Sequence, residues 1–134
     1  PKATGRLMYT LKSRDPLVKL INTPDFIQRV RDLAGNQRLV PCPQIPVEYR
    51  KYVVGSYMDW HKDTKMLKDQ LQYECVITVT NTSDSETLMD KIIYTSSIET
   101  APNSVIIVRA EGVMHKVTEL TTGERTIIKL VFCE

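Results

Sequence analysis

The sequence has few of the features that mark a secreted or membrane-bound protein. Of its 134 residues only three are cysteines, Cys42, Cys75 and Cys133. An odd number, at spacings of 33 and 58 residues, supports neither a disulfide framework nor a zinc knuckle and predicts buried or half-buried free thiols in a reducing compartment. No apolar run approaches the roughly 18 residues of a membrane span, and residues 1–10 lack the apolar segment of a signal peptide. We therefore expect no membrane contact and favour an intracellular location.

The net charge is also small, and histidine is scarce. The net charge of +2 is too small to indicate binding to nucleic acid by itself. The two histidines, His61 and His115, fall in no Ser-His-Asp pattern, and no paired carboxylates suggest acid–base hydrolysis. With 42% apolar and 25% charged residues, the composition is that of an ordinary globular protein, so we expect residues 1–134 to form a single domain.

The first third of the chain is predicted to be helical. Asp15-Pro16 opens a short apolar turn or helix. Thr23-Pro24 has the pattern of an N-cap followed by proline in the first turn, and Gly35-Asn36 supplies a stop. An amphipathic helix is therefore expected at Pro24–Ala34, within a helical support of about residues 14–40. Its apolar stripe comprises Phe26, Ile27, Val30, Leu33 and Ala34.

The remainder is predicted to be mainly β. The proline-rich segment 41–46 is at best an extended edge. Short β-branched segments then alternate with turn-like stretches. They are Y-R-K-Y-V-V (49–54), C-V-I-T-V-T (75–80), K-I-I-Y-T (91–95), S-V-I-I-V-R (104–109) and R-T-I-I-K-L-V-F (125–132). Such a series after helices predicts an antiparallel sandwich or jelly roll, that is, a double-stranded β-helix, with a β core of about residues 47–134.

The segment M-D-W-H-K-D-T contains His61 and Asp63, two residues apart. In an extended strand such residues point to the same face. Together with His115 they have the composition of the two-histidine, one-carboxylate facial triad of non-haem iron oxygenases. An isolated H-x-D is weak evidence, because a solvated loop and an unrelated second histidine have the same residues.

Arg125 lies ten residues after His115, at the start of the last apolar segment. Strand alternation places Arg125, Ile127, Lys129 and Val131 on one face. A guanidinium inside a sheet is suited to bidentate binding of a carboxylate. The alternative is an edge arginine at a hairpin, which the preceding T-T-G-E allows.

In combination these motifs resemble the iron(II)- and 2-oxoglutarate-dependent oxygenases, in particular the prolyl 4-hydroxylase-like branch. The pattern Y-x-x-G-x-x-Y-x-x-H-x-D is matched by Tyr52, Gly55, His61 and Asp63, and the later H-x-V by His115-Lys116-Val117. The resemblance implies that His61, Asp63 and His115 bind Fe(II). It further implies that Arg125 binds the distal carboxylate of 2-oxoglutarate and that Tyr52 lies beside the metal and cosubstrate.

The resemblance has three departures. Met58 stands where the family has its second tyrosine, and Tyr57 comes one residue early. Val79–Asn81 replaces a Y-L-N-like stretch, which removes a tyrosine partner for the cosubstrate. Lys129 either compensates for that loss or directs its charge outward.

The resemblance implies a dioxygenase that uses Fe(II), 2-oxoglutarate and dioxygen, with ascorbate as an optional further cofactor. Prolyl residues in a peptide or protein are the leading substrate class, with a small molecule as a second option. An AlkB-like nucleic-acid demethylase ranks lower, since no N-R-x-x-x-x-x-R stretch follows His115. A cupin-like metal-binding domain without oxygenase activity, or a sandwich that only binds partners, would need no Arg125.

Overall fold

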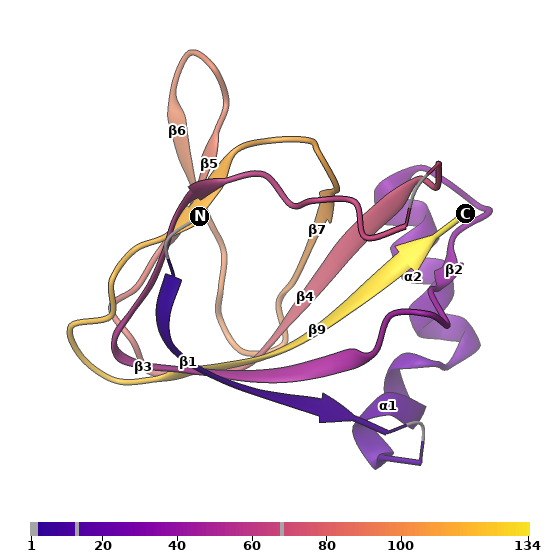
Figure 1. Cartoon of the computed structure of the whole chain (residues 1–134), viewed down its shortest axis with the longest axis horizontal. Coiled ribbons are helices and arrows are strands. Elements are labelled where there is room, and N and C mark those ends of the chain that lie inside the picture. Colours follow the sequence, from indigo (N-terminus) through magenta and orange to yellow (C-terminus); the bar gives the residue numbers. More distant parts are fainter. Residues whose placement is uncertain (1–2, 13, 68) are drawn as a thin grey trace.

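The computed structural model describes residues 3–12, 14–67 and 69–134. Strands that run side by side form the body of the molecule, two helices lie at one end, and a hairpin projects from the opposite part (Figure 1). None of the helices in the described residues is long and apolar enough to cross a membrane. The elements are β1 (Ala3–Leu11), α1 (Pro16–Ile21), α2 (Pro24–Ala34), β2 (Val40–Pro41), β3 (Val47–His61), β4 (Gln72–Asn81), β5 (Thr87–Asp90), β6 (Thr95–Ile98), β7 (Val105–Arg109), β8 (His115–Val117) and β9 (Arg125–Cys133).

Both helices begin and end where the local sequence predicts. The carboxylate of Asp15 accepts a hydrogen bond from the Leu17 amide at the start of α1. The Thr23 hydroxyl does the same for Phe26 at the start of α2. Gly35 ends α2 in the left-handed conformation, with φ of 68°, which glycine adopts without a steric cost. These are local signals, so they act whatever the rest of the chain does.

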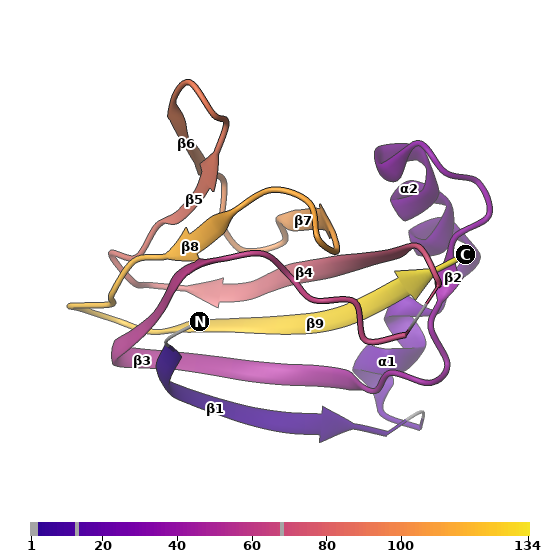
Figure 2. The ribbon, with the colours of Figure 1, turned by 45° about the horizontal axis from the view of Figure 1, so that its top comes forward.

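The strands form one antiparallel sheet that folds over on itself into two leaves (Figure 2). The long leaf contains β1, the first half of β3, β9, β4 and β7, and β2 pairs with the end of β9. The short leaf contains the second half of β3, β8, β5 and β6. This arrangement confirms the predicted mainly β, jelly-roll type of fold, with the difference that β3 joins the two leaves.

A bend at Gly55 lets β3 serve both leaves. Residues up to Tyr52 pair with β9, whereas Met58 and His61 pair with β8. Gly55 lies between the two halves with φ of 91°, a conformation that side chains disfavour. Its amide donates to the carbonyl of Leu120, which ties the bend to the segment before β9. The bend therefore carries the chain from the long leaf to the start of the H-x-D motif.

The outer face of the long leaf is covered by the helices. The buried cluster there contains Ile21, Val30, Leu39, Cys75, Ile128, Leu130 and Phe132. Because β9 alternates, Ile128, Leu130 and Phe132 enter this core while Arg125, Ile127 and Lys129 face the interior between the leaves. All three cysteines are free and buried, as expected.

Three sequence predictions are wrong in detail. Residues 3–11, inside the part predicted as helical, form strand β1 at the edge of the long leaf. The segment 91–95 is mostly the tip of the β5–β6 hairpin, where Asp90 accepts from the Ile92 amide and leaves Ile92 95% exposed. Leu33, placed on the buried stripe of α2, is 70% exposed. In each case the local sequence pattern did not predict which strand the segment pairs with or whether its side chains are covered.

Candidate functional site

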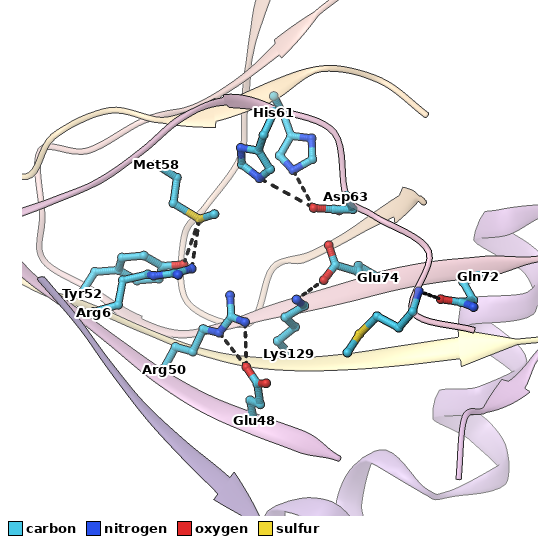
Figure 3. A network of polar contacts seen from close by, with 12 residues as sticks. Arg6, Glu48, Arg50, Tyr52, Met58, His61, Asp63, Gln72, Glu74 and Lys129 are labelled. Atoms are coloured by element: carbon cyan, nitrogen blue, oxygen red, sulfur yellow. Dashed lines mark hydrogen bonds and ion pairs between the residues drawn. The ribbon is translucent and has the colours of Figure 1, made fainter. Parts of the chain in front are cut away.

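The two histidines and Asp63 meet at the end of the short leaf. His61 is the last residue of β3, His115 is the first of β8, and the two are register partners in the antiparallel pair. Asp63 follows β3 by two residues and turns back toward them (Figure 3). Its Oδ1 lies 3.7 Å from His61 Nε2 and 3.3 Å from His115 Nε2. One ligand atom from each of the three residues can be chosen so that all lie within 4.8 Å of one another.

The backbone orients both imidazoles. Nδ1 of His61 lies 2.6 Å from the carbonyl oxygen of Asp59, and Nδ1 of His115 lies 3.1 Å from that of Val113. A carbonyl oxygen only accepts, so each Nδ1 carries the proton. In the neutral tautomer each Nε2 lone pair is then directed toward Asp63. This is the orientation that outer hydrogen bonds impose on histidines that bind metals.

The pKa values of the two imidazoles shift in opposite directions. Burial, reinforced by the neighbouring His115, lowers the pKa of His61. Burial by itself would also lower the pKa of His115, but hydrogen bonds to Asp63 and to the Val113 carbonyl raise it by more. The carboxylate therefore favours a positive charge in its vicinity. A divalent cation bound between the three groups would meet this preference.

A cavity of about 290 Å³ extends from these residues between the two leaves. Its lining contains the residues singled out in the sequence: His61, Asp63, His115, Arg125 and Tyr52. The residues Lys62, Thr64 and Met66, which follow the triad strand, also line it. The volume is near the lower end of the range for ligand pockets.

Arg125 lines this cavity and is buried, 3% exposed. Its Nη1 donates to the Thr87 hydroxyl at 3.1 Å and its Nη2 to the Thr78 hydroxyl at 3.2 Å. Its Nε has no hydrogen-bond partner among the described residues. Burial lowers the pKa of the guanidinium because it desolvates the charge, and no ion pair to Arg125 is found among the described residues. An anionic ligand in the cavity would supply the hydrogen-bond acceptor and the negative charge that this arginine lacks.

Tyr52 is buried beside Arg125. The two residues are register partners on β3 and β9, and Tyr52 is 3% exposed. Its hydroxyl lies 3.8 Å from the sulfur of Met58, which occupies the position of the missing family tyrosine. Tyr57 is not among the described residues that line the cavity. Met58 therefore faces the cavity at the position where the family pattern has a tyrosine ring.

Lys129 faces the cavity rather than the solvent. It forms an ion pair with Glu74 (Figure 3). Burial lowers its pKa, and the positive charges of Arg50 and Arg6 lower it further. The ammonium group of Lys129 is therefore already paired with Glu74. The side chains that contact Arg125 are instead the hydroxyls of Thr78 and Thr87.

The sequence reasoning did not identify Thr87, Met58 or Arg6 as cavity residues, nor Thr78 as a contact of Arg125. Val76 and Glu74 line the cavity, and Thr78 shares their alternating face of β4, so a position near Arg125 was available from the strand period. Thr87 was hidden because its segment was predicted to be a turn. Arg6 was hidden because β1 itself was not predicted.

The donor set fits a metal ion and an acid ligand. Two neutral imidazole nitrogens and one carboxylate match the preference of ferrous iron for a facial triad with open positions. The unpartnered Nε of buried Arg125 provides a donor for an anion in the same cavity. Fold and site together define a jelly-roll protein with a two-histidine, one-carboxylate centre.

Comparison with known proteins gives structural matches at low sequence identity. No family model and no curated protein matches the chain. An oxidoreductase of the 2OG-Fe(II) oxygenase family from Burkholderia pseudomallei superimposes with a TM-score of 0.73 at 16% identity, over 94% of this chain and 63% of that one. A prolyl-4-hydroxylase from Pseudomonas putida gives a TM-score of 0.71 at 11% identity, over 95% and 71%.

A third similar structure was determined with a peptide. It is a prolyl hydroxylase from Trichoplax adhaerens in complex with a hypoxia inducible factor oxygen degradation domain peptide fragment. Its TM-score is 0.71 at 11% identity, over 96% of this chain and 63% of that one. The chain thus spans less than two thirds of the Burkholderia and Trichoplax proteins. The similarity confirms the resemblance at the level of the fold.

Proposed function

We propose that the chain is an iron(II)- and 2-oxoglutarate-dependent dioxygenase that hydroxylates prolyl residues in a peptide or protein. The observation that carries the proposal is that the His61, Asp63 and His115 cluster and the buried, under-satisfied Arg125 line one cavity. A metal site alone would not need this arginine. An arginine alone would not need two imidazoles held in the same tautomer.

Each of these residues has a distinct task in the proposed reaction. His61, Asp63 and His115 would hold Fe(II), which would supply oxygen-transfer chemistry coupled to the oxidative decarboxylation of 2-oxoglutarate to succinate and carbon dioxide. The Arg125 guanidinium binds the distal carboxylate of 2-oxoglutarate, with Thr78 and Thr87 holding the guanidinium in place. Tyr52, Met58, Val76 and Ile127 line the space between these groups and exclude water.

The similar structures favour a peptide substrate. Two of the similar structures are prolyl hydroxylases, and one of them was determined with a peptide fragment. A nucleic-acid demethylase has less support, because the net charge is +2 and residues 115–134 contain no N-R-x-x-x-x-x-R stretch. In a cupin-like protein without oxygenase activity, no acid ligand would be expected at the unpartnered Nε of Arg125. Ascorbate as a cofactor stays a prediction.

The decisive experiment measures succinate formed from 2-oxoglutarate by the Fe(II)-loaded protein in the presence of dioxygen. Proline-containing peptides, free proline and methylated oligonucleotides are compared as substrates, and the products are examined by mass spectrometry. We expect succinate with the wild-type protein, its loss in Asp63→Asn, and one added oxygen atom on a peptide. Absence of 2-oxoglutarate turnover would refute the proposal, and turnover coupled to the oligonucleotide alone would move it to the demethylase class.

A further inference from the structure

The cavity carries more positive charge than one acid cosubstrate requires. Five cationic side chains and two carboxylates line it. The cations are Arg6, Arg50, Lys62, Arg125 and Lys129, and the carboxylates are Asp63 and Glu74. Asp63 belongs to the triad and Glu74 pairs with Lys129. Arg125 is assigned to 2-oxoglutarate in the function proposed above, on which this inference rests.

Arg50 is already compensated from outside the cavity lining. Its Nη2 lies 2.7 Å from the Glu48 carboxylate and its Nε donates to the same oxygen at 2.8 Å. Lys62 is exposed and its charge is solvated. Arg6 is different from both, because it is partly buried and has no carboxylate within ion-pair distance among the described residues.

The partner that Arg6 does have is a weak one. Its Nη1 lies 3.4 Å from the sulfur of Met58, and a thioether is a poor hydrogen-bond acceptor. The same sulfur accepts from the Tyr52 hydroxyl at 3.8 Å. Figure 3 shows Arg6 and Tyr52 together on the wall below Met58. Since a guanidinium has five N–H donors, Arg6 retains most of its hydrogen-bonding capacity for a ligand.

The position of Arg6 relative to Arg125 follows from the strand register. Arg6 on β1 is the partner of Tyr52 on β3, and Tyr52 is the partner of Arg125 on β9. Two strand spacings separate the two arginine backbones, which is about 10 Å. The cavity therefore has two guanidinium positions, one on each side of Tyr52.

We propose that Arg6 binds a carboxylate of the substrate, so that the enzyme selects substrates with an acidic group close to the carbon that is oxidised. The carboxylate belongs either to the side chain of an acidic residue next to the hydroxylated residue of a peptide, or to a free amino acid. In both cases the recognised chemistry is the same, and the register separates this anion position from that of Arg125. A neutral substrate would leave the Arg6 charge facing the cavity without compensation.

The test uses probes that differ by one charge. Acetylated, amidated peptides carry Glu or Gln beside a proline, and L-proline is compared with L-prolinamide. Succinate release by the Fe(II)-loaded protein is measured for each pair. We expect the acidic member to have a KM lower by tens-fold or more, the range typical of a desolvated charge pair. The peptide and free-acid pairs identify the source of the carboxylate.

Substitution of Arg6 then locates the effect. Arg6→Gln is expected to remove the preference for the acidic probe, and Arg6→Lys to restore it in part, because lysine keeps the charge without the fork. Arg109→Gln makes the same change at an exposed arginine of β7 and should keep the preference. Equal rates with acidic and neutral probes, including no stimulation by either, overturn the proposal. So does an Arg6→Gln variant whose main change is a raised KM for 2-oxoglutarate. Failure of the wild type to turn over 2-oxoglutarate at all would instead refute the proposed function.

Discussion

His61 and His115 face each other across β3 and β8, and each donates Nδ1–H to the backbone carbonyl two residues before it. The two rings lie with their centroids 4.3 Å apart. Because the backbone sets both tautomers, the Nε2 atoms are prepared for a ligand before it binds. Pre-orientation of this kind lowers the entropy cost of metal binding.

The triad predicts the effect of single ligand substitutions on metal affinity. His61→Ala, His115→Ala and Asp63→Asn should each weaken Fe(II) or Co(II) binding by more than the roughly 100-fold that loss of an outer hydrogen-bond partner can cost. Metal titration followed by the fluorescence of Trp60, the single tryptophan, measures this without an activity assay. Asp59→Asn is the matched control, because the carbonyl that orients His61 remains. Wild-type affinity in Asp63→Asn would contradict the assignment.

Arg125 predicts a specific effect on the cosubstrate. Arg125→Ala should raise the KM for 2-oxoglutarate by tens- to thousands-fold, the equivalent of about 2–5 kcal/mol for one desolvated charge pair. Arg125→Lys should recover part of the loss, since it keeps the charge but not the bidentate fork. Arg109→Ala, an exposed arginine, controls for general charge. An unchanged KM in Arg125→Ala would show that the acid is bound elsewhere, with Lys129 as the next residue to replace.

Tyr52→Phe tests the role of one buried hydroxyl. The ring packs with Leu120 and Ile127 and stays in place, while the hydroxyl near Met58 is lost. We expect metal binding to persist and turnover to fall by the worth of about one hydrogen bond, about 0.5–1.5 kcal/mol. Tyr57→Phe, at a position not found in the cavity lining of the described residues, should leave turnover unchanged. If both variants behave alike, the Tyr52 hydroxyl has no part in the reaction.

Gly123 and Gly35 allow a matched test of stability. Both have a left-handed backbone, with φ of 71° and 68°. A methyl group at Gly35 would meet nothing within 4 Å, whereas at Gly123 it would collide with the Thr82 carbonyl. Gly35→Ala should lower the free energy of unfolding by about 1–2 kcal/mol, and Gly123→Ala by about 1–3 kcal/mol more. Urea denaturation measures both values, and equal losses would mean that the turn before Arg125 relaxes freely.

Cys75 predicts loss of stability at alkaline pH. Complete burial raises the pKa of its thiol to about 12 from an ordinary value of 9.0. Above pH 9 the unfolded chain releases this proton and the folded chain keeps it, so the free energy of unfolding falls as pH rises toward 12. The contribution is at most about 1.4 kcal/mol per pH unit. Urea unfolding of wild type and Cys75→Ala between about pH 9 and 11 isolates it, and parallel pH profiles would contradict the burial argument.

Local signals in the sequence determined the helices, the strand period and the core of the metal motif. Asp15, Thr23 and Gly35 define helix ends through contacts with residues only a few positions away. The two-residue period of β9 placed Ile127 and Ile128 on opposite faces before any partner strand was known. Such features are readable because their physical cause lies within one turn or one strand. The H-x-D spacing was also visible in the sequence, but Asp63 lies two residues beyond β3, so the extended strand expected through both residues ends at His61.

Contacts between distant segments were decided only by the tertiary structure. β1 is a strand because it pairs with β3, which lies some 50 residues further along the chain. Arg6, for example, is the register partner of Tyr52. The hydroxyls that hold Arg125 come from β4 and β5, and the apolar segment at residues 91–95 is exposed because the pairing of β5 with β6 places it at a hairpin tip. An alternating or apolar pattern predicts which side chains of a segment share one face. Which neighbour each face meets depends on the bend at Gly55 and on the folding of the sheet into two leaves, and this brings His61, His115, Arg125 and Arg6 to one cavity.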